Sequence, residues 1–287
     1  MTQTNLFSDE HITHTYNDVR PNIYPSATQV ILDYCFSINA ACDKILDIGC
    51  GTGRSTQPFR RVANRVLGVD PSPQIIRQAI KSEGVEFRIG SAESLPTDEK
   101  FDLAIASMAF HYFDRSKFLS ELNRVLSPSG IFVACECGFG GDIGNPGYKT
   151  WLSEDLFAQY PDKVERKRIS SYFKDGSSKD ENSKDESSNQ FRIIHQQTYT
   201  YIEGYTPERL VTYVLSKSNF ANLSHSEIRA LRKRIYQKLI PYWSSTLKLV
   251  KFRGKAWFIT RKTNEIINRK RNWYMPLISA FKGLRQV

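Results

Sequence analysis

The sequence lacks the features of a disulfide-stapled or membrane-embedded protein. Its 287 residues hold five cysteines, an odd number, and no C-x-x-C pair, so neither a disulfide framework nor a zinc site is indicated. No apolar run approaches the length needed to span a bilayer, and the first residues show no basic-then-apolar signal pattern. The absence of these features predicts reduced thiols, no bound metal and a cytoplasmic location.

Positive charge is also scarce outside the C-terminal fifth of the chain. From Arg229 onward, 16 Lys and Arg face a single acid, Glu265, for a net charge of +15, whereas the preceding residues carry about −5. Aromatic residues, Trp257 and Phe258 among them, interleave with these cations. The combination is typical of RNA-binding surfaces and of membrane-surface helices. A solvated basic surface with an apolar face docked on the domain is the third interpretation, and all three stay open.

Apolar strand patterns alternate with helical ones through the first half of the chain. The expected strands are 44–48, 65–70, 85–89, 101–107 and 130–136. The expected helices are 26–38, 55–63, 73–81 and 116–126. Near-continuous apolar strands that alternate with helices predict a buried parallel sheet.

The second half of the chain is less regular. The low-complexity, charge-mixed residues 174–190 cannot bury a core and are predicted to be disordered. The remaining expected elements are a strand at 191–201, a helix that begins at Pro207 after a capping threonine, a helix at 224–240 and a last strand at 255–261.

The most informative run is residues 45–56, ILDIGCGTGRST. An apolar strand leads into Gly49, Gly51 and Gly53, where a backbone without Cβ atoms can turn sharply and approach a ligand. A helix opening behind the turn would offer unpaired N–H groups. Asp47 places an acceptor carboxylate beside the turn, which suits an amine-bearing or cationic ligand better than a pyrophosphate.

A second carboxylate, Asp70, follows the second expected strand. It lies 17 residues after Gly53, close to the interval at which an acidic residue meets a ribose hydroxyl pair in such folds. One carboxylate can accept from both hydroxyls. The alternative is a solvated turn aspartate in the run Asp-Pro-Ser, so Asp70 and Pro71 are candidate ligand contacts.

The alternating glycines and Asp47 resemble motif I of the class I S-adenosylmethionine-dependent methyltransferases. Five segments between residues 16 and 136 follow that family's order and are similar to its methyltransferase type 11 group. Residues 206–219 look like the late helix of trans-aconitate and similar carboxyl methyltransferases. The resemblance implies an α/β, Rossmann-like, seven-stranded, mostly parallel sheet with helices on both faces, a helical substrate-lid insertion, and S-adenosylmethionine as the cofactor.

The resemblance also implies site residues beyond the glycine turn. In relatives, the segment that holds Ser91, Ala92 and Glu93 edges the adenine, although the commonest pattern has Asp where this chain has Ser91. A backbone carbonyl at Ser107 or Met108 would take the methionine ammonium. The full candidate cofactor set is Tyr16, Arg20, Asp47, Gly49, Cys50, Gly51, Gly53, Asp70, Pro71, Ser91, Ala92, Glu93, Ser107 and Met108.

Three of these side chains have specific implied roles. Arg20 could pair with the methionine carboxylate, and Tyr16 could close over the sulfonium by a cation–π contact. His111 is expected to project toward the substrate, where it could act as a general base for a hydroxyl acceptor. The alternatives are an exposed arginine in a helix lead-in and a histidine that packs beside its aromatic neighbours.

The implied organisation has four parts: a cofactor-capping segment (1–43), a cofactor-binding core (44–136), a substrate lid with the final strands (137–263) and a basic amphipathic tail (264–287). The expected activity is methyl transfer to a small-molecule acceptor, with O-methylation of a carboxylate or hydroxyl favoured. No Asn-Pro-Pro-Tyr motif follows the fourth strand, which disfavours adenine or amide N-methylation. The alternatives are an RNA methyltransferase that uses the basic tail and a non-catalytic binding protein of the same fold.

Overall fold

The computed structural model describes residues 19–162, 169–173, 190–220 and 223–263. The predictions for Tyr16, for the low-complexity residues 174–189 and for the tail 264–287 therefore lie outside the described residues.

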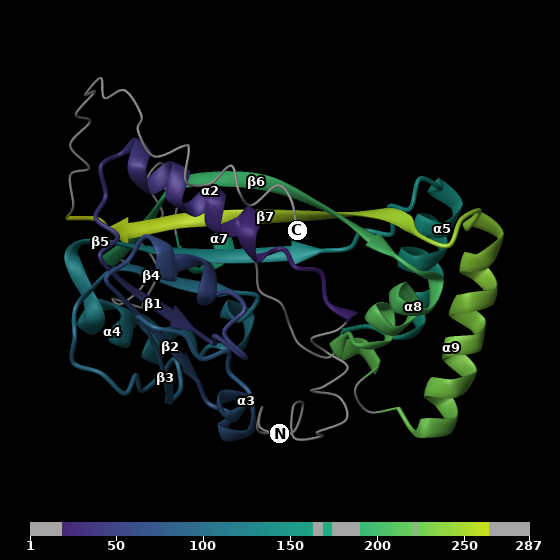
Figure 1. Ribbon diagram of the computed structural model, residues 1–287, viewed down its shortest axis with the longest axis horizontal. Helices are drawn as coiled ribbons and strands as arrows, with labels where there is room; N and C mark the ends of the chain where they lie inside the picture. Colours follow the sequence, from purple (N-terminus) through teal and green to yellow (C-terminus); the bar gives the residue numbers. More distant parts are fainter. Residues whose placement is uncertain (1–18, 163–168, 174–189, 221–222, 264–287) are drawn as a thin grey trace.

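A seven-stranded sheet with the order β3-β2-β1-β4-β5-β7-β6 forms the centre of the molecule (Figure 1). Its strands are β1 (Lys44–Ile48), β2 (Arg65–Asp70), β3 (Val85–Ile89), β4 (Phe101–Ser107), β5 (Leu126–Gly138), β6 (Phe191–Tyr205) and β7 (Lys248–Arg261). Strand β7 is antiparallel to both β5 and β6, and the other neighbouring pairs are parallel. The predicted Rossmann-like, mostly parallel sheet is confirmed.

The first four strands have the predicted bounds, but the last three are longer than the sequence suggested. Strand β5 begins at Leu126, which pairs with Phe101 before a register shift. Strand β7 begins seven residues before the predicted 255, because its paired register with β6 continues from Arg261 down to Lys248. Residues 248–255 hold three lysines, one arginine and one glycine among three apolar residues, without a regular alternation, so the sequence did not indicate a strand here.

The helices are α2 (Tyr24–Ser37), α3 (Pro73–Arg77), α4 (Arg115–Val125), α5 (Pro146–Thr150), α6 (Phe157–Gln159), α7 (Ile169–Tyr172), α8 (Pro207–Leu215) and α9 (His225–Leu239). Short 3-10 turns lie at η2 (Gln57–Arg61), η3 (Phe110–Tyr112), η6 (Ser218–Phe220) and η7 (Ile240–Tyr242), and η4 (Trp151–Leu156) is a π-helix.

Two predicted helices were wrong in extent. The prediction at 55–63 is a run of turns followed by η2, because Ser55 and Thr56 direct their hydroxyls inward to a buried carboxylate. The prediction at 73–81 ends at Arg77, since the Ile80 amide donates to the Thr52 carbonyl instead of continuing the helical ladder.

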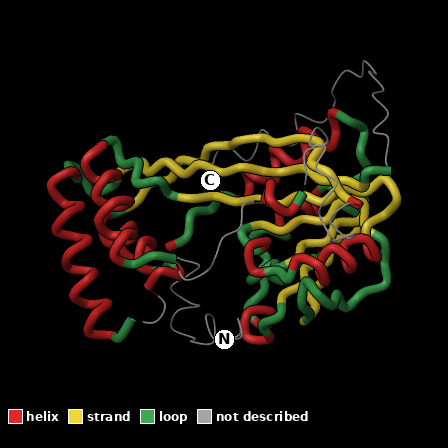
Figure 2. Tube along the Cα trace, turned by 180° about the vertical axis from the view of Figure 1, so that it is seen from behind, coloured by secondary structure: helices red, strands yellow, loops and turns green. Residues whose placement is uncertain are grey.

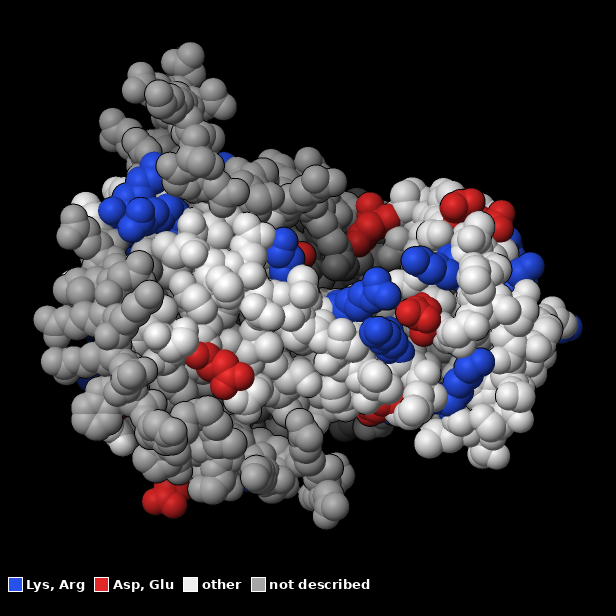
Figure 3. Space-filling model, turned by 90° about the horizontal axis from the view of Figure 1, so that it is seen from above, with Lys and Arg blue, Asp and Glu red and all other residues white. Residues whose placement is uncertain are grey.

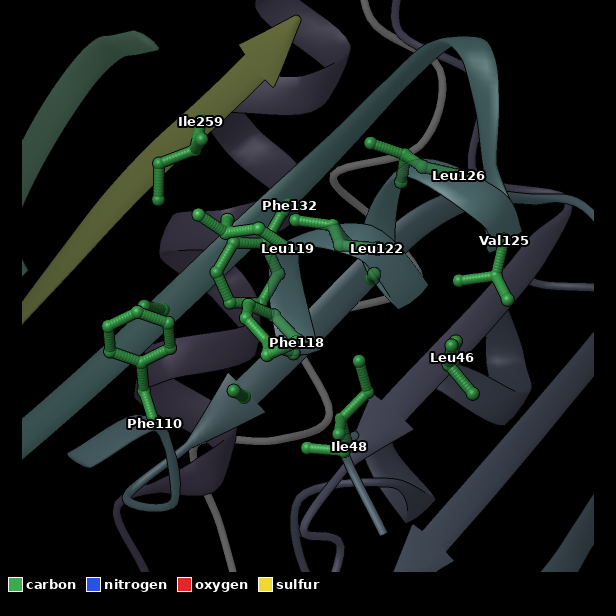
Figure 4. Packing of buried hydrophobic residues seen from close by; sticks show 14 of the residues in the cluster. Leu46, Ile48, Phe110, Phe118, Leu119, Leu122, Val125, Leu126, Phe132 and Ile259 are labelled. Atoms are coloured by element: carbon green, nitrogen blue, oxygen red, sulfur yellow. The ribbon is translucent and has the colours of Figure 1, made fainter. Parts of the chain in front are cut away.

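Helices cover both faces of the sheet because successive strand residues point to opposite sides. On one face α2 packs Ile31 and Leu32 into a cluster with Ile45. On the other face α4 packs Phe118 against Phe132, as Figure 4 shows. The predicted placement of helices on both faces is confirmed.

A second hydrophobic cluster lies where β6 and β7 run beyond the rest of the sheet (Figures 1 and 2). We call this region the distal lobe: α5, η4, α6, α8, α9 and the far ends of β6 and β7. Tyr213 and Phe252 meet at its centre, with ring centroids 5.5 Å apart. The lobe is helical, as expected of a substrate lid, and that role stays a prediction.

The described residues of the basic C-terminal fifth lie partly in the core and partly on the surface. Phe258 is fully buried in the sheet and does not belong to an exposed surface. Trp257 packs against the core but stays partly exposed, and Lys255 Nζ lies 5.1 Å from its ring centroid. In the face shown in Figure 3, the described Lys and Arg side chains are interspersed with Asp and Glu.

The described helices include none that is both long and apolar enough to cross a membrane. All five cysteines are free thiols, and four of them are buried. Within the described ranges, no group of three His, Cys, Asp or Glu side chains is arranged to hold a metal ion.

Gly254 is required for the β6–β7 pairing. A Cβ at this position would lie 2.1 Å from the Tyr199 ring, which is buried against the strand. We expect Gly254→Ala to lower the free energy of unfolding by about 1–3 kcal/mol, the usual cost of overpacking. The measurement is urea unfolding followed by circular dichroism.

Gly138 provides the matched control, because it lies on the neighbouring strand β5 and a Cβ there would meet no atom within 4 Å. Gly138→Ala should change stability by less than about 0.5 kcal/mol. Equal effects of the two substitutions would show that the Tyr199 contact does not matter.

Candidate functional site

The glycine turn lies at the carboxyl end of β1, between β2 and β4. The amides of Gly49 and Cys50 both donate to the Val69 carbonyl, at 2.7 and 3.1 Å, and so hold the turn against β2. A Cβ on Gly49 would lie 2.4 Å from the Cβ of Ala109, so the turn also packs directly on the loop after β4. The glycine turn and the post-β4 loop are therefore one structural unit.

Gly51 is the open position of the turn. Its φ of +57° lies in the left-handed region, and a Cβ there would meet no atom within 4 Å. Its amide donates to Oδ2 of Asp70 at 3.0 Å, while Oδ1 of Asp70 accepts from the Ser72 amide at 3.0 Å. Burial raises the pKa of Asp70, so these two amides hold a carboxylate that is partly removed from water.

Asp47 is fully buried directly below the turn. Its Oδ2 accepts from the hydroxyls of Ser55 and Thr56, at 2.6 and 2.7 Å. Burial raises its pKa to about 6, and the two hydroxyl bonds oppose the rise. Among the described residues, Oδ1 of Asp47 has no hydrogen-bond partner, which is uncommon for a buried carboxylate.

A second unpaired polar atom lies at the end of β4. The hydroxyl of Ser107 is buried and has no hydrogen-bond partner in the described part of the chain. The next residue, Met108, has φ +60°, a conformation that is costly for a residue with a side chain. Its amide donates to the Cys135 carbonyl at 2.8 Å, and its sulfur accepts from the Cys137 amide. Strand β5 therefore holds the backbone at Met108 in place.

The loop that follows β3 lies next to Asp70, since the Gly90 amide donates to the Asp70 carbonyl at 3.1 Å. Ser91 forms a bridge with Ser94, and Ala92 is buried. Glu93 accepts from the Asp114 amide at 2.8 Å, at the N-cap of α4. Glu93 therefore ties this loop to the start of α4.

His111 and Arg20 belong to different parts of the structure. His111 is buried in η3, two residues after Ala109, which packs on Gly49. The centroid of the His111 ring lies 4.1 Å from that of Tyr112. Arg20 donates to the Ser216 carbonyl at 2.9 Å and lies 5.4 Å from the Tyr213 ring centroid, so it contacts the distal lobe.

The sequence analysis did not single out Ser55 and Thr56. Their signal was present, because two hydroxyl residues lie two and three positions after Gly53, and Asp47 lies two positions before Gly49. A buried carboxylate needs donors, and small hydroxyl side chains at the start of a turn can provide them.

These groups fit S-adenosylmethionine. The unpaired Oδ1 of Asp47 and the unpaired hydroxyl of Ser107 can receive or bind a cationic amine, and Asp70 stands where a ribose would meet it. The open space beside Gly51 can hold part of a ligand, and a side chain at position 51 would occupy that space.

Comparison with known proteins supports this assignment. Residues 46–134 match the family described as "Methyltransferase domain". The ubiquinone biosynthesis O-methyltransferase of Bradyrhizobium sp. (strain ORS 278) is 35% identical over 96 residues, 31% of this chain and 38% of the relative. The mitochondrial ubiquinone biosynthesis O-methyltransferase of Homo sapiens is 33% identical over 133 residues, 42% of this chain and 36% of the relative. The chain thus spans less than half the length of these curated relatives.

One solved structure extends the likeness in fold. A protein from Anaeromyxobacter dehalogenans, named as a type II methyltransferase, aligns with a TM-score of 0.57 at 21% identity, over 79% of this chain and 93% of its own. The alignment covers most of both chains. The narrower similarity to trans-aconitate methyltransferases is not confirmed by these matches.

We expect Gly51→Ala to weaken S-adenosylmethionine binding roughly tenfold or more, because the added Cβ would occupy the space beside the turn. Gly84→Ala is the matched control: Gly84 also has a positive φ and an open Cβ position, but it lies before β3. Both substitutions should cost about 1 kcal/mol of stability. Titration calorimetry that finds equal affinities in the two variants would contradict a ligand at Gly51.

The raised pKa of Asp47 predicts a specific pH dependence. The folded state favours the protonated carboxyl, so the contribution of Asp47 to stability is present below pH about 4 and is lost as the pH rises through about 6. Asp47→Asn cannot titrate. The stability of the wild type relative to this variant should therefore fall by about 3 kcal/mol between pH 4 and 7.5. Urea unfolding at each pH measures it, and a constant difference would refute the assignment.

Proposed function

We propose that this chain, a class I S-adenosylmethionine-dependent methyltransferase by fold and by its domain match, transfers a methyl group to a small-molecule acceptor. The observation that carries the proposal is the buried pair of unpaired polar atoms, Asp47 Oδ1 and Ser107 Oγ, at the carboxyl ends of adjacent strands beside an open glycine turn. Ligands of open α/β sheets bind at this edge.

The residues around the turn have distinct proposed roles. Asp70 accepts from the ribose hydroxyls, and the backbone at Ser91 and Ala92 contacts the adenine amine. Asp47, Ser107 and the Met108 carbonyl receive the methionine ammonium, while Arg20 pairs with the methionine carboxylate. The turn residues Gly49, Cys50, Gly51 and Gly53, with Pro71, approach the nucleoside closely.

Bound S-adenosylmethionine supplies a methyl group that is already activated by the positive charge on sulfur. The task of the chain is therefore to align the acceptor and exclude water. A carboxylate acceptor needs no base, whereas a hydroxyl acceptor would lose its proton to a base, for which His111 is the candidate. The distal lobe, tied to the residues before α2, forms the acceptor side of the site.

The names of the curated relatives favour a small-molecule acceptor that is methylated on oxygen. Both curated relatives described above are ubiquinone biosynthesis O-methyltransferases, and their names support an oxygen acceptor at low identity. The candidate RNA- or membrane-binding tail lies outside the described residues. Retained cofactor binding with no methylated product would instead favour a non-catalytic binding protein.

Asp70→Asn tests the cofactor assignment. We expect it to weaken S-adenosylmethionine binding roughly ten- to hundredfold, since hydrogen bonds to a charged group contribute about 1.5–3 kcal/mol. Asp33→Asn, on the exposed side of α2, removes the same charge and should have no effect. Titration calorimetry measures both. Failure of the wild type to bind, or unchanged affinity in Asp70→Asn, would overturn the assignment.

A further inference from the structure

A groove lies between helices α8 and α9, at the end of the molecule opposite to strands β1–β4 (Figures 1 and 2). Its volume is about 400 Å³, within the range of small-molecule sites. Helix α8 contributes residues to one wall and helix α9 to the other, among them Glu208, Val211, Arg229, Arg232, Lys233 and Tyr236. None of these residues belongs to the proposed cofactor site, so the groove is separate from it.

The α9 side of the groove concentrates positive charge. Arg229, Arg232 and Lys233 are three and four positions apart, so they share one side of the helix, and all three side chains are exposed. No Asp or Glu lies three or four positions from any of them in the sequence. The single acid of α9, Glu227, is committed to the capping box with Ser224. The helix therefore places these like charges beside one another, which destabilises it unless an anion compensates.

Cations elsewhere in the structure have carboxylate partners. Arg65, for example, lies 2.8 Å from Glu86 and 2.7 Å from Glu99. Within the described ranges, by contrast, no ion pair involves a residue of α9. Arg232 donates instead to the neutral hydroxyl of Thr212 on α8, at 2.8 Å. This hydrogen bond holds the guanidinium at the groove without neutralising its charge.

The groove combines this charge with apolar surface. Val211 is buried and Tyr236 is half-buried, and both line it. Glu208 is the one acid of the lining against three cations, so the groove has a net positive charge. The opposite side of α9 is buried in the distal lobe and cannot insert into a membrane, because it carries the core residues Leu231, Ile235 and Leu239.

We propose that the groove between α8 and α9 binds an organic anion with two or more negative charges and a planar apolar part, the chemistry of a nucleoside diphosphate. The guanidinium groups of Arg229 and Arg232 and the Lys233 ammonium bind its phosphate oxygens. The ring of Tyr236 packs against its planar part. The small volume of the groove favours one such ligand over an extended RNA strand. This binding does not depend on the proposed methyl transfer.

The test uses the full chain with an excess of S-adenosylhomocysteine, which keeps the probes out of the proposed cofactor site. Titration calorimetry compares ADP, inorganic pyrophosphate and adenosine. ADP should bind more tightly than pyrophosphate, and adenosine should not bind. The affinity for ADP should fall with added salt, because the three cations are exposed.

Two variants separate the charged from the apolar part of the groove. Arg232→Gln combined with Lys233→Gln should weaken ADP binding roughly ten- to hundredfold, since each removes hydrogen bonds to a charged group. Tyr236→Leu should weaken ADP binding and leave the affinity for pyrophosphate unchanged. Circular dichroism of each variant checks that the fold is retained.

Arg234→Gln combined with Lys238→Gln is the matched control. It removes the same charge from the same helix, but both side chains lie over the Trp151 ring, 6.0 and 5.9 Å from its centroid. This variant should bind ADP like the wild type. Equal weakening in both double variants would mean a diffuse effect of charge and would overturn the proposal, as would adenosine binding as tightly as ADP or no ADP binding at all. A single-stranded RNA that binds and is not displaced by ADP would assign the groove to RNA instead.

Discussion

The buried carboxylate of Asp47 is the constraint on which the site depends. A charge so placed must be compensated, and the hydroxyls of Ser55 and Thr56 provide part of that compensation. Their inward direction replaces a regular helix with a tight series of turns. Those turns bring the Gly51 amide within hydrogen-bond distance of the Asp70 carboxylate. The geometry of the glycine turn thus follows from how the hydrogen bonds of one buried carboxylate are satisfied.

The sheet core was predictable from sequence because β1, β2 and β4 are largely buried and read as near-continuous apolar runs. The parts of β6 and β7 that lie in the distal lobe were not predictable, since charged residues interrupt their apolar pattern and their pairing joins residues that are far apart in the sequence. The candidate residues at the strand ends were likewise predictable, because parallel strands bring their carboxyl ends to one edge. The contact of Arg20 with the distal lobe was not, because only the packing of α8 brings Ser216 and Tyr213 to it.

Residues 19–24 connect the distal lobe with the sheet core. Val19 accepts from the buried Tyr205 hydroxyl at 2.8 Å, and the Asn22 amide donates to Glu203 at 3.1 Å, so this segment is attached to the distal lobe. Helix α2, which begins at Tyr24, packs on the sheet core. Arg54 from the glycine turn lies 5.6 Å from the Tyr24 ring centroid. Residues 19–24 therefore contact both the distal lobe and the glycine turn.

The long β6–β7 ribbon has a consequence for how such a protein can diversify. The sheet core and the distal lobe are separate hydrophobic clusters, and the ribbon passes through both with one register shift, between Ile193 and His195. Substitutions in one cluster lie far from the other, so their energetic effects should add. Substitutions in the distal lobe should therefore leave the geometry of the glycine turn unchanged.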